Sequence, residues 1–126
     1  ETYVKTLTPK VGGTLVIEQL AKDFKLDWVI LFSSLSGIIG NIGQTDYAAA
    51  NAFLNAITRH NNKTNTLSKW YSINWGLWQS ESGMQMENTS LLEAMLPQKA
   101  LASMCQLLAQ QVEIAAIYQG AYSLVD

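Results

Sequence analysis

The sequence predicts an α/β fold built on a doubly wound parallel sheet. Three apolar or β-branched runs have the composition of buried strands, at residues 28–32, 70–75 and 114–118. They alternate with segments of helical periodicity, in the order helix, strand, helix, strand, two helices, strand. This alternation is typical of parallel strands joined by right-handed crossovers. Three strands are few for such a sheet, and the first would present a long apolar edge, so we expect a larger domain.

The composition also indicates a part of something larger. At 126 residues the chain has the length of one ordinary domain. Its charged fraction of 14% lies below the roughly 25% of soluble domains, so we expect other chains or further sequence to cover some of its surface. The first residues, ETYVK, contain neither an initiator methionine nor a signal-peptide segment. We interpret residues 1–126 as one piece of a single domain, cut from a longer polypeptide.

Several classes of function are disfavoured. The net charge of −2 gives no electrostatic footprint for nucleic acid or an anionic membrane. No apolar run approaches the ~18 residues of a transmembrane helix. Cys105 is the only cysteine, which excludes an internal disulfide and fits a reducing, cytoplasmic compartment. His60 has no second histidine or acidic cluster near it in the sequence, so we expect no metal.

The first 24 residues carry apolar side chains near a 3.6-residue period, which predicts a helix. Its apolar stripe consists of Val4, Leu7, Val11, Leu15 and Leu20. The Thr8-Pro9 step leaves two interpretations open. Either the helix begins there with Thr8 as N-cap, or a longer helix is kinked.

The central part of the chain predicts a strand, a loop and a second helix. Residues 28–32 form a continuous apolar run, which predicts a strand covered on both faces. Residues 35–45 form a loop with glycine at every third position, which permits close packing and tight turns. A helix from Tyr47 to about His60 follows, favoured by five alanines. Its buried face consists of Phe53, Leu54 and Ile57.

The last half predicts a polar surface connection over residues 61–69, a strand over residues 70–75 and a flexible segment over residues 76–88. Ser90 and Glu93 have capping-box spacing, which predicts a short helix.

Pro97 suits the first turn of another helix, and residues 114–118 form the last strand. The predicted buried stripe of that helix consists of Leu101, Met104, Cys105 and Leu108. We therefore expect Cys105 to be an inert, buried thiol.

Ser34 and Tyr47 flank the glycine loop, at the end of a strand where doubly wound sheets bind their ligands. Tyr47 and Asn51 are four residues apart and share a helix face. A cation beside a tyrosine favours the phenolate, and Lys10 could supply that cation. A serine hydroxyl could hold a carbonyl oxygen, so the group could protonate a ketone as hydride arrives from a nicotinamide. Taken singly, each of these residues is more typical of packing or of a solvated surface.

Ser34 and Tyr47 resemble the serine and tyrosine of the short-chain dehydrogenase/reductases, which usually carry lysine where this chain has Asn51. The wider pattern is PKVGGT, then FSSLSGIIGNIGQTDYAAANAFL, then INWGLW. It is similar to the ketoreductase domains of modular polyketide synthases, in which the lysine lies on the preceding helix, as Lys10 does, and an asparagine follows the tyrosine. The resemblance covers nearly the whole chain and implies the C-terminal catalytic half of a Rossmann-like domain.

The resemblance implies a role for each residue. Tyr47 would donate a proton to the β-keto oxygen, Ser34 would hydrogen-bond that oxygen, and Lys10 and Asn51 would order the proton relay. Residues implied to bind cofactor are Ser33, Trp75, Gly76 and Leu77. Residues 79–96 are implied to form a mobile lid over the substrate. The residues implied to contact the substrate or to belong to this lid are Leu35, Gln44, Trp78, Gly83 and Met84.

The implied reaction is the reduction, by NADPH, of a β-ketoacyl group on the phosphopantetheine of an acyl carrier protein. The dinucleotide-binding glycine fingerprint is absent from the chain, because in the family it precedes the position of residue 1. We therefore expect the N-terminal half of the ketoreductase and other megasynthase domains as partners, a homo-oligomer, and no activity of this chain alone. Two alternatives are a degenerate, non-reducing structural module of the megasynthase and a free-standing short-chain reductase.

Overall fold

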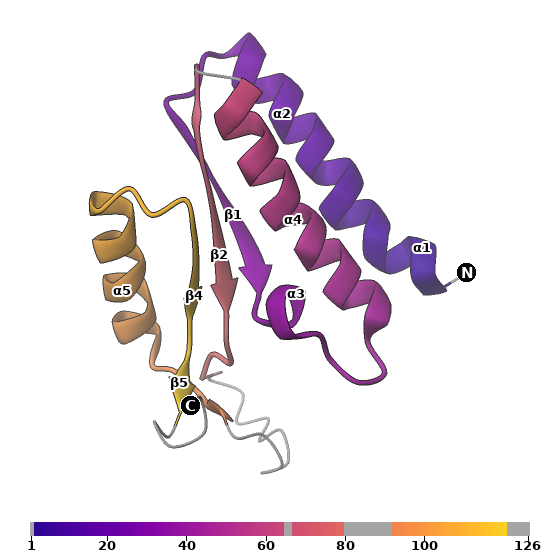
Figure 1. Ribbon diagram of the computed structural model, residues 1–126, viewed down its shortest axis with the longest axis vertical. Helices are drawn as coiled ribbons and strands as arrows, with labels where there is room; N and C mark the ends of the chain where they lie inside the picture. The colour runs from indigo at the N-terminus through magenta and orange to yellow at the C-terminus, as the bar shows by residue number, and fades with distance from the viewer. Residues whose placement is uncertain (1, 65–66, 80–91, 121–126) are drawn as a thin grey trace.

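The computed structural model describes residues 2–64, 67–79 and 92–120. Its centre is a parallel sheet in the order β1-β2-β4 (Figure 1). The strands are β1 (Trp28–Ser34), β2 (Lys69–Trp75) and β4 (Ile114–Ile117). All of β1 pairs with β2, whereas β4 pairs only with the second half of β2. The predicted parallel α/β fold is confirmed.

Helices cover both faces of this sheet. They are α1 (Thr2–Leu7), a π-helical turn η1 (Thr8–Gly12), α2 (Gly13–Asp23), α3 (Ser36–Ile39), α4 (Thr45–Thr64) and α5 (Pro97–Ala109). In Figure 1, α2 and α4 lie side by side on one face and α5 lies on the other. This is the doubly wound arrangement that the alternation predicts.

The first helix runs through the Thr8-Pro9 step, so the interpretation that it begins at Thr8 is wrong. Pro9 has no backbone N–H, and its ring crowds the carbonyl four residues before it. The chain accommodates Pro9 with a π-helical turn, and the Thr8 hydroxyl donates to the Val4 carbonyl at 2.7 Å. Lys10 follows within the same turn, and such turns are frequent at functional sites.

The alternation of side chains along β2 separates two cores. Trp70 faces α4 and packs with buried residues of α2, β1 and α4. Ile73 and Trp75 point to the opposite face and pack against α5 and β4. A strand buried on both faces explains why residues 70–75 combine large apolar with small polar side chains.

The first strand differs from the prediction, because one of its two faces is only partly covered, with Ile30 packed against the core under α5. Val29 and Leu31 are buried under the helices, but Trp28 is 61% and Phe32 51% exposed. The reason is that α5 packs over β2 and β4 and leaves the far side of β1 partly open in the described part of the chain. The predicted stripe of the first helix is also partly exposed, at Val4, Leu15 and Leu20.

Helix α4 is longer than predicted, and the polar connection begins later. Asn61 is buried and lies on the helix, and the Asn62 side chain bonds both backbone groups of Trp70, at 2.8 and 2.9 Å. An asparagine side chain thus occupies the place that a neighbouring strand would take beside the start of β2.

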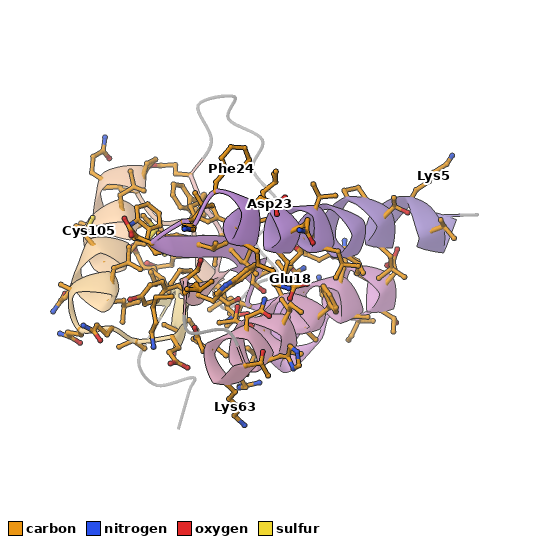
Figure 2. All side chains as sticks on the ribbon, turned by 90° about the horizontal axis from the view of Figure 1, so that it is seen from above. Lys5, Glu18, Asp23, Phe24, Lys63 and Cys105 are labelled. Atoms are coloured by element: carbon orange, nitrogen blue, oxygen red, sulfur yellow. The ribbon has the colours of Figure 1, made fainter. Side chains whose placement is uncertain are left out.

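The region after β2 also differs. Leu92–Glu93 is strand β3 and pairs antiparallel with β5 (Gln119–Gly120), so the prediction of a short helix that includes Glu93 is wrong. Cys105 is exposed, and Figure 2 shows it on the outer side of α5. The side of α5 that packs on the sheet carries Ala100, Met104 and Leu107, one step from the predicted stripe.

The glycine loop brings α3 against α4. A Cβ on Gly37 would lie 2.9 Å from the carbonyl carbon and Cβ of Asn51, so only glycine allows this approach. Gly40 and Gly43 have φ values of 75° and 76°, the left-handed region that glycine adopts without strain. The predicted use of these glycines for close packing and tight turns is confirmed.

We expect Gly37→Ala to lower the free energy of unfolding by about 1–3 kcal/mol, because the added methyl group would push α3 away from α4. Gly13→Ala is the matched control, since a Cβ there meets nothing within 4 Å. It should leave the stability unchanged or raise it by up to about 1 kcal/mol. Urea denaturation followed by tryptophan fluorescence measures both, and equal effects of the two variants would contradict the role of Gly37.

Candidate active site

A cleft of about 1220 Å³ opens where β1 and β2 end. Nine of the predicted site residues line it: Ser33, Ser34, Leu35, Gln44, Tyr47, Trp75, Gly76, Leu77 and Trp78. Lys10 and Asn51 do not line the cleft, but they contact Tyr47. Gly83, Met84 and most of the predicted lid lie outside the described residues. The structure therefore brings together every predicted site residue that it describes.

Asn51 connects the two residues on which the sequence argument depends. Lys10 Nζ donates to Asn51 Oδ1 at 2.7 Å, and Asn51 Nδ2 donates to the Tyr47 carbonyl at 2.8 Å. The same ammonium group lies 5.5 Å from the centre of the Tyr47 ring. Asn51 itself is fully buried. A fixed cation therefore stands against a tyrosine that lines the cleft.

Burial lowers the pKa of Lys10 below its ordinary value of 10.5, and the Coulombic interaction with Tyr47 opposes that change. Lys10 Nζ also donates to the Phe32 carbonyl at 3.2 Å. Two acceptors and an aromatic face thus hold this half-buried ammonium group in place.

Ser34 is positioned by a residue that the sequence argument did not single out. The Ser36 hydroxyl donates to Ser34 Oγ at 3.0 Å, and the Ser36 backbone N–H does so at 3.3 Å. Since Ser34 Oγ accepts both bonds, its own hydrogen is left to donate into the cleft. The signal in the sequence is the spacing of the two serines, which is typical of a local side-chain turn.

Hydrogen bonds to backbone carbonyl groups hold the walls of the cleft together. Ser33 Oγ donates to the Asn51 carbonyl at 3.1 Å and joins β1 to α4. The Leu35 N–H donates to the Trp75 carbonyl at 2.9 Å, and the Gly76 N–H donates to the Ile117 carbonyl at 2.8 Å. A Cβ on Gly76 would lie 2.9 Å from Tyr118 Cβ, so this turn is closely packed.

Aromatic rings form one side of the cleft. Trp75 is in contact with Phe32, with ring centres 5.3 Å apart, and with Trp78 at 4.8 Å in an edge-on geometry. These contacts hold the Trp75–Leu77 turn beside Ser33 and Ser34. The cleft is larger than the ~300–1,000 Å³ of most ligand sites.

The N-terminus of α4 contributes another residue that the sequence argument did not assign to the site. Asp46 is the one charged side chain among the described residues that line the cleft. A hydrogen bond from Thr6 on α1 is the main reason why the pKa of Asp46 lies below its ordinary value. This hydrogen bond joins α1 to the first turn of α4.

Two kinds of site find no support in the described residues. In ranges 2–64, 67–79 and 92–120, no three histidine, cysteine or acidic residues stand close enough to hold a metal ion. Across the same ranges, no helix has the length and hydrophobicity needed to span a membrane.

Known proteins resemble this chain in sequence. The family model described as "KR domain" matches residues 1–80. Polyketide synthase PksN of Bacillus subtilis (strain 168) is 38% identical over 123 residues, which are 93% of this chain and 2% of that protein. Polyketide synthase PksL of the same organism is 45% identical over 91 residues, 69% of this chain and 2% of that protein.

Solved structures give the same result. A ketoreductase domain from the bacillaene assembly line matches with a TM-score of 0.87 at 32% identity, covering 98% of this chain and 32% of that one. A structure of A-type ketoreductases from a modular polyketide synthase matches with a TM-score of 0.81 at 30% identity, covering 94% and 26%. The chain thus spans about a third or less of these two structures.

The lowered pKa of Lys10 predicts a pH dependence of stability. Between the lowered pKa and 10.5 the unfolded chain binds a proton that the folded chain releases. This group therefore makes the free energy of unfolding rise with pH over that window, and its contribution levels off above 10.5.

We expect the difference in free energy of unfolding, wild type minus Lys10→Met, to increase as pH is raised towards 10.5, the ordinary pKa of lysine. Denaturation midpoints of both proteins across this range measure it. Lys63→Met is the control, because Lys63 points away from the body of the protein (Figure 2). A difference for Lys10→Met that stays constant or falls would contradict the burial effect.

Proposed function

The chain belongs to the KR domain family, and on that premise we propose that it supplies the catalytic corner of a β-ketoacyl reductase. The reaction would reduce a β-keto group to a β-hydroxyl group during polyketide synthesis. The observation that carries the proposal is the connection from Lys10 through Asn51 to Tyr47 behind the cleft. Three separate segments contribute to this connection and to Ser34.

Tyr47 would act as the general acid. As the carbonyl carbon accepts hydride, the C=O π bond breaks, and the Tyr47 hydroxyl gives its proton to the carbonyl oxygen. The ammonium group of Lys10 would stabilise the tyrosinate that this transfer leaves. Asn51 keeps Lys10 in place through its Oδ1 and would order the path by which the proton is replaced.

Ser34 would hold the substrate carbonyl. Ser36 already donates to Ser34 Oγ, so the free hydroxyl hydrogen of Ser34 is available to the ketone oxygen. A fixed donor aimed at the oxygen stabilises the negative charge that develops there during reduction. Ser36 therefore acts through Ser34 and is a positioning residue.

NADPH is the cofactor that we propose, and it would supply the hydride when bound. Ser33, Trp75, Gly76 and Leu77 would hold its nicotinamide end, because they form the cleft wall nearest the strand ends. The parts of the site for the remainder of the dinucleotide would come from the N-terminal half of the domain. Residues 1–126 would then be the C-terminal part of one ketoreductase domain.

The proposed substrate is a β-ketoacyl group carried on the phosphopantetheine of an acyl carrier protein. The similarity to polyketide synthases supports this partner, since these proteins are megasynthases of which this chain matches 2%. Leu35, Gln44 and Trp78 line the same cleft and would contact the acyl chain, with Gly83 and Met84 as further proposed contacts. Other megasynthase domains and a second copy of the polypeptide are the remaining proposed partners.

We expect Tyr47→Phe to lower kcat for ketone reduction by at least about 100-fold, because it removes the proton donor. A complete ketoreductase domain with this change, assayed on a small β-ketothioester, provides the test. NADPH binding, followed by its fluorescence, should remain. Tyr71→Phe, a buried tyrosine of β2 outside the cleft, is the matched control.

Full turnover by Tyr47→Phe would refute the assignment of the acid. A wild-type domain that binds NADPH but reduces no ketone would instead support the degenerate, structural module.

Ser36→Ala should lower kcat about five- to tenfold, since it removes one hydrogen bond that orients Ser34. KM for NADPH should not change. Ser103→Ala removes a comparable hydroxyl on α5, where Ser103 Oγ donates to the Lys99 carbonyl, and should have no effect. Equal kcat values for wild type and Ser36→Ala would contradict the positioning role.

A further inference from the structure

Two buried asparagines pair across the interface between α4 and the sheet. Asn55 Nδ2 donates to Asn74 Oδ1 at 2.9 Å, and Asn74 Nδ2 donates back to Asn55 Oδ1 at 3.1 Å. Ser72 Oγ also donates to Asn55 Oδ1, at 2.7 Å, and Asn74 Nδ2 donates to the Ala115 carbonyl at 3.1 Å. These three side chains are at most 6% exposed. None of them touches the cleft, so the proposed reaction leaves the group unexplained.

The pair joins the two elements between which the cleft lies. Asn55 is one helical turn beyond Asn51 and two turns beyond Tyr47 on α4. Asn74 immediately precedes Trp75 on β2, and its bond to Ala115 extends the connection to β4. One amide pair thus links the helix that carries the proposed acid to the strand end proposed to hold the nicotinamide.

Polar groups in this interface carry a cost that apolar packing would not. Each amide loses its bonds to water on burial, and the loss is offset only if every donor and acceptor finds a partner in one arrangement. Apolar side chains at these positions would select the position of the helix along the strand less sharply, because apolar contacts are not directional. A reciprocal amide pair is satisfied at one relative position, so it selects that position.

We propose that Asn55 and Asn74 are positioning residues, which hold α4 at one height on β2 and so set Tyr47 against the Trp75–Gly76 turn. The consequence for reduction rests on the proposed function, because a displacement between proton donor and hydride donor would slow the transfer. The hold of α4 on the strand does not rest on it and can be tested by a measurement that needs no enzyme activity.

The directions of the bonds distinguish the two asparagines. Asn55 Oδ1 accepts two bonds, from Ser72 and Asn74, whereas its Nδ2 donates one. Asn74 Nδ2 donates two bonds, and its Oδ1 accepts one. Replacement by aspartate keeps the size of the side chain but exchanges the amide donor for an acceptor oxygen and adds an acidic group. Both variants share that change, so they differ in the bonds that they keep. Asn55→Asp therefore keeps the two bonds that its Oδ1 accepts, out of three. Asn74→Asp keeps at most the one bond that its Oδ1 accepts, and its new oxygen faces Asn55 Oδ1 and the Ala115 carbonyl oxygen.

The first measurement is hydrogen–deuterium exchange of the complete ketoreductase domain by mass spectrometry. The amides to follow are Leu35, which donates to the Trp75 carbonyl, and Gly76, which donates to Ile117. Asn74→Asp should speed their exchange at least about tenfold, and Asn55→Asp should change it by less than about threefold. Thr58→Val is the matched control, since Thr58 is equally buried on α4 but bonds only its own helix, through the Leu54 carbonyl.

The second measurement is the kinetics of ketone reduction by the same proteins. Asn74→Asp should lower kcat at least about tenfold and raise the primary deuterium isotope effect of labelled NADPH, with KM for NADPH within about twofold of wild type. Asn55→Asp and Thr58→Val should retain kcat within about threefold. A general loss of stability would instead change kcat of all three variants in proportion to their unfolding.

If Asn74→Asp does not fold, Asn55→Ala and Asn55→Asp decide the matter. The alanine variant loses all three bonds, and the aspartate variant keeps two. Slower reduction and faster exchange in the alanine variant alone would support the proposal. Equal behaviour of these two variants, or wild-type exchange at Leu35 and Gly76 in folded Asn74→Asp, would overturn it. A wild-type domain without reductase activity would refute the proposed function, and the exchange measurement would still decide the positioning role.

Discussion

The buried amide of Asn51 is the interaction on which the rest of the site depends. Its oxygen accepts from Lys10, its nitrogen donates to the Tyr47 carbonyl, and its own backbone carbonyl accepts from Ser33. One residue thus joins the first helix, α4 and β1 at full burial. Gly37 permits this junction, because any larger residue would displace α3 from the backbone of Asn51. The loop, the strand end and both helices meet at this amide.

Much of this arrangement could be predicted from the sequence, because the strand and helix signals are strong around the site. The apolar run before Ser33 and the alanine-rich helix after Tyr47 place these residues at one end of a parallel sheet. Lys10 is different, since nothing in its local sequence indicates a contact with Asn51. The resemblance to a family brought it into the prediction, and the hydrogen bond between the two side chains agrees with that choice.

The wrong predictions about the fold have a common physical cause. Contacts with residues distant in the sequence outweigh the local sequence pattern on which each prediction was based. Glu93 belongs to a strand because β5 pairs with that segment, although its spacing from Ser90 is typical of a capping box. The polar residues 61 and 62 continue α4 because they reach inward, and Asn62 bonds the backbone of Trp70. Cys105 is exposed because the contact side of α5 is rotated by one position. Composition alone could not reveal these long-range contacts.

Helix α4 meets the sheet through hydrogen bonds to three different partners, made by the backbone carbonyl of Asn51 and by the side chains of Asn55 and Asn62. These partners lie at fixed positions along β1 and β2, so the spacing of the three asparagines along the helix must match the spacing of their partners along the strands. A single residue inserted between Tyr47 and Asn62 would turn everything beyond it by about 100° and carry the later asparagines away from their partners. A change in the length of this helix would therefore disturb the site more than a substitution on its exposed side would.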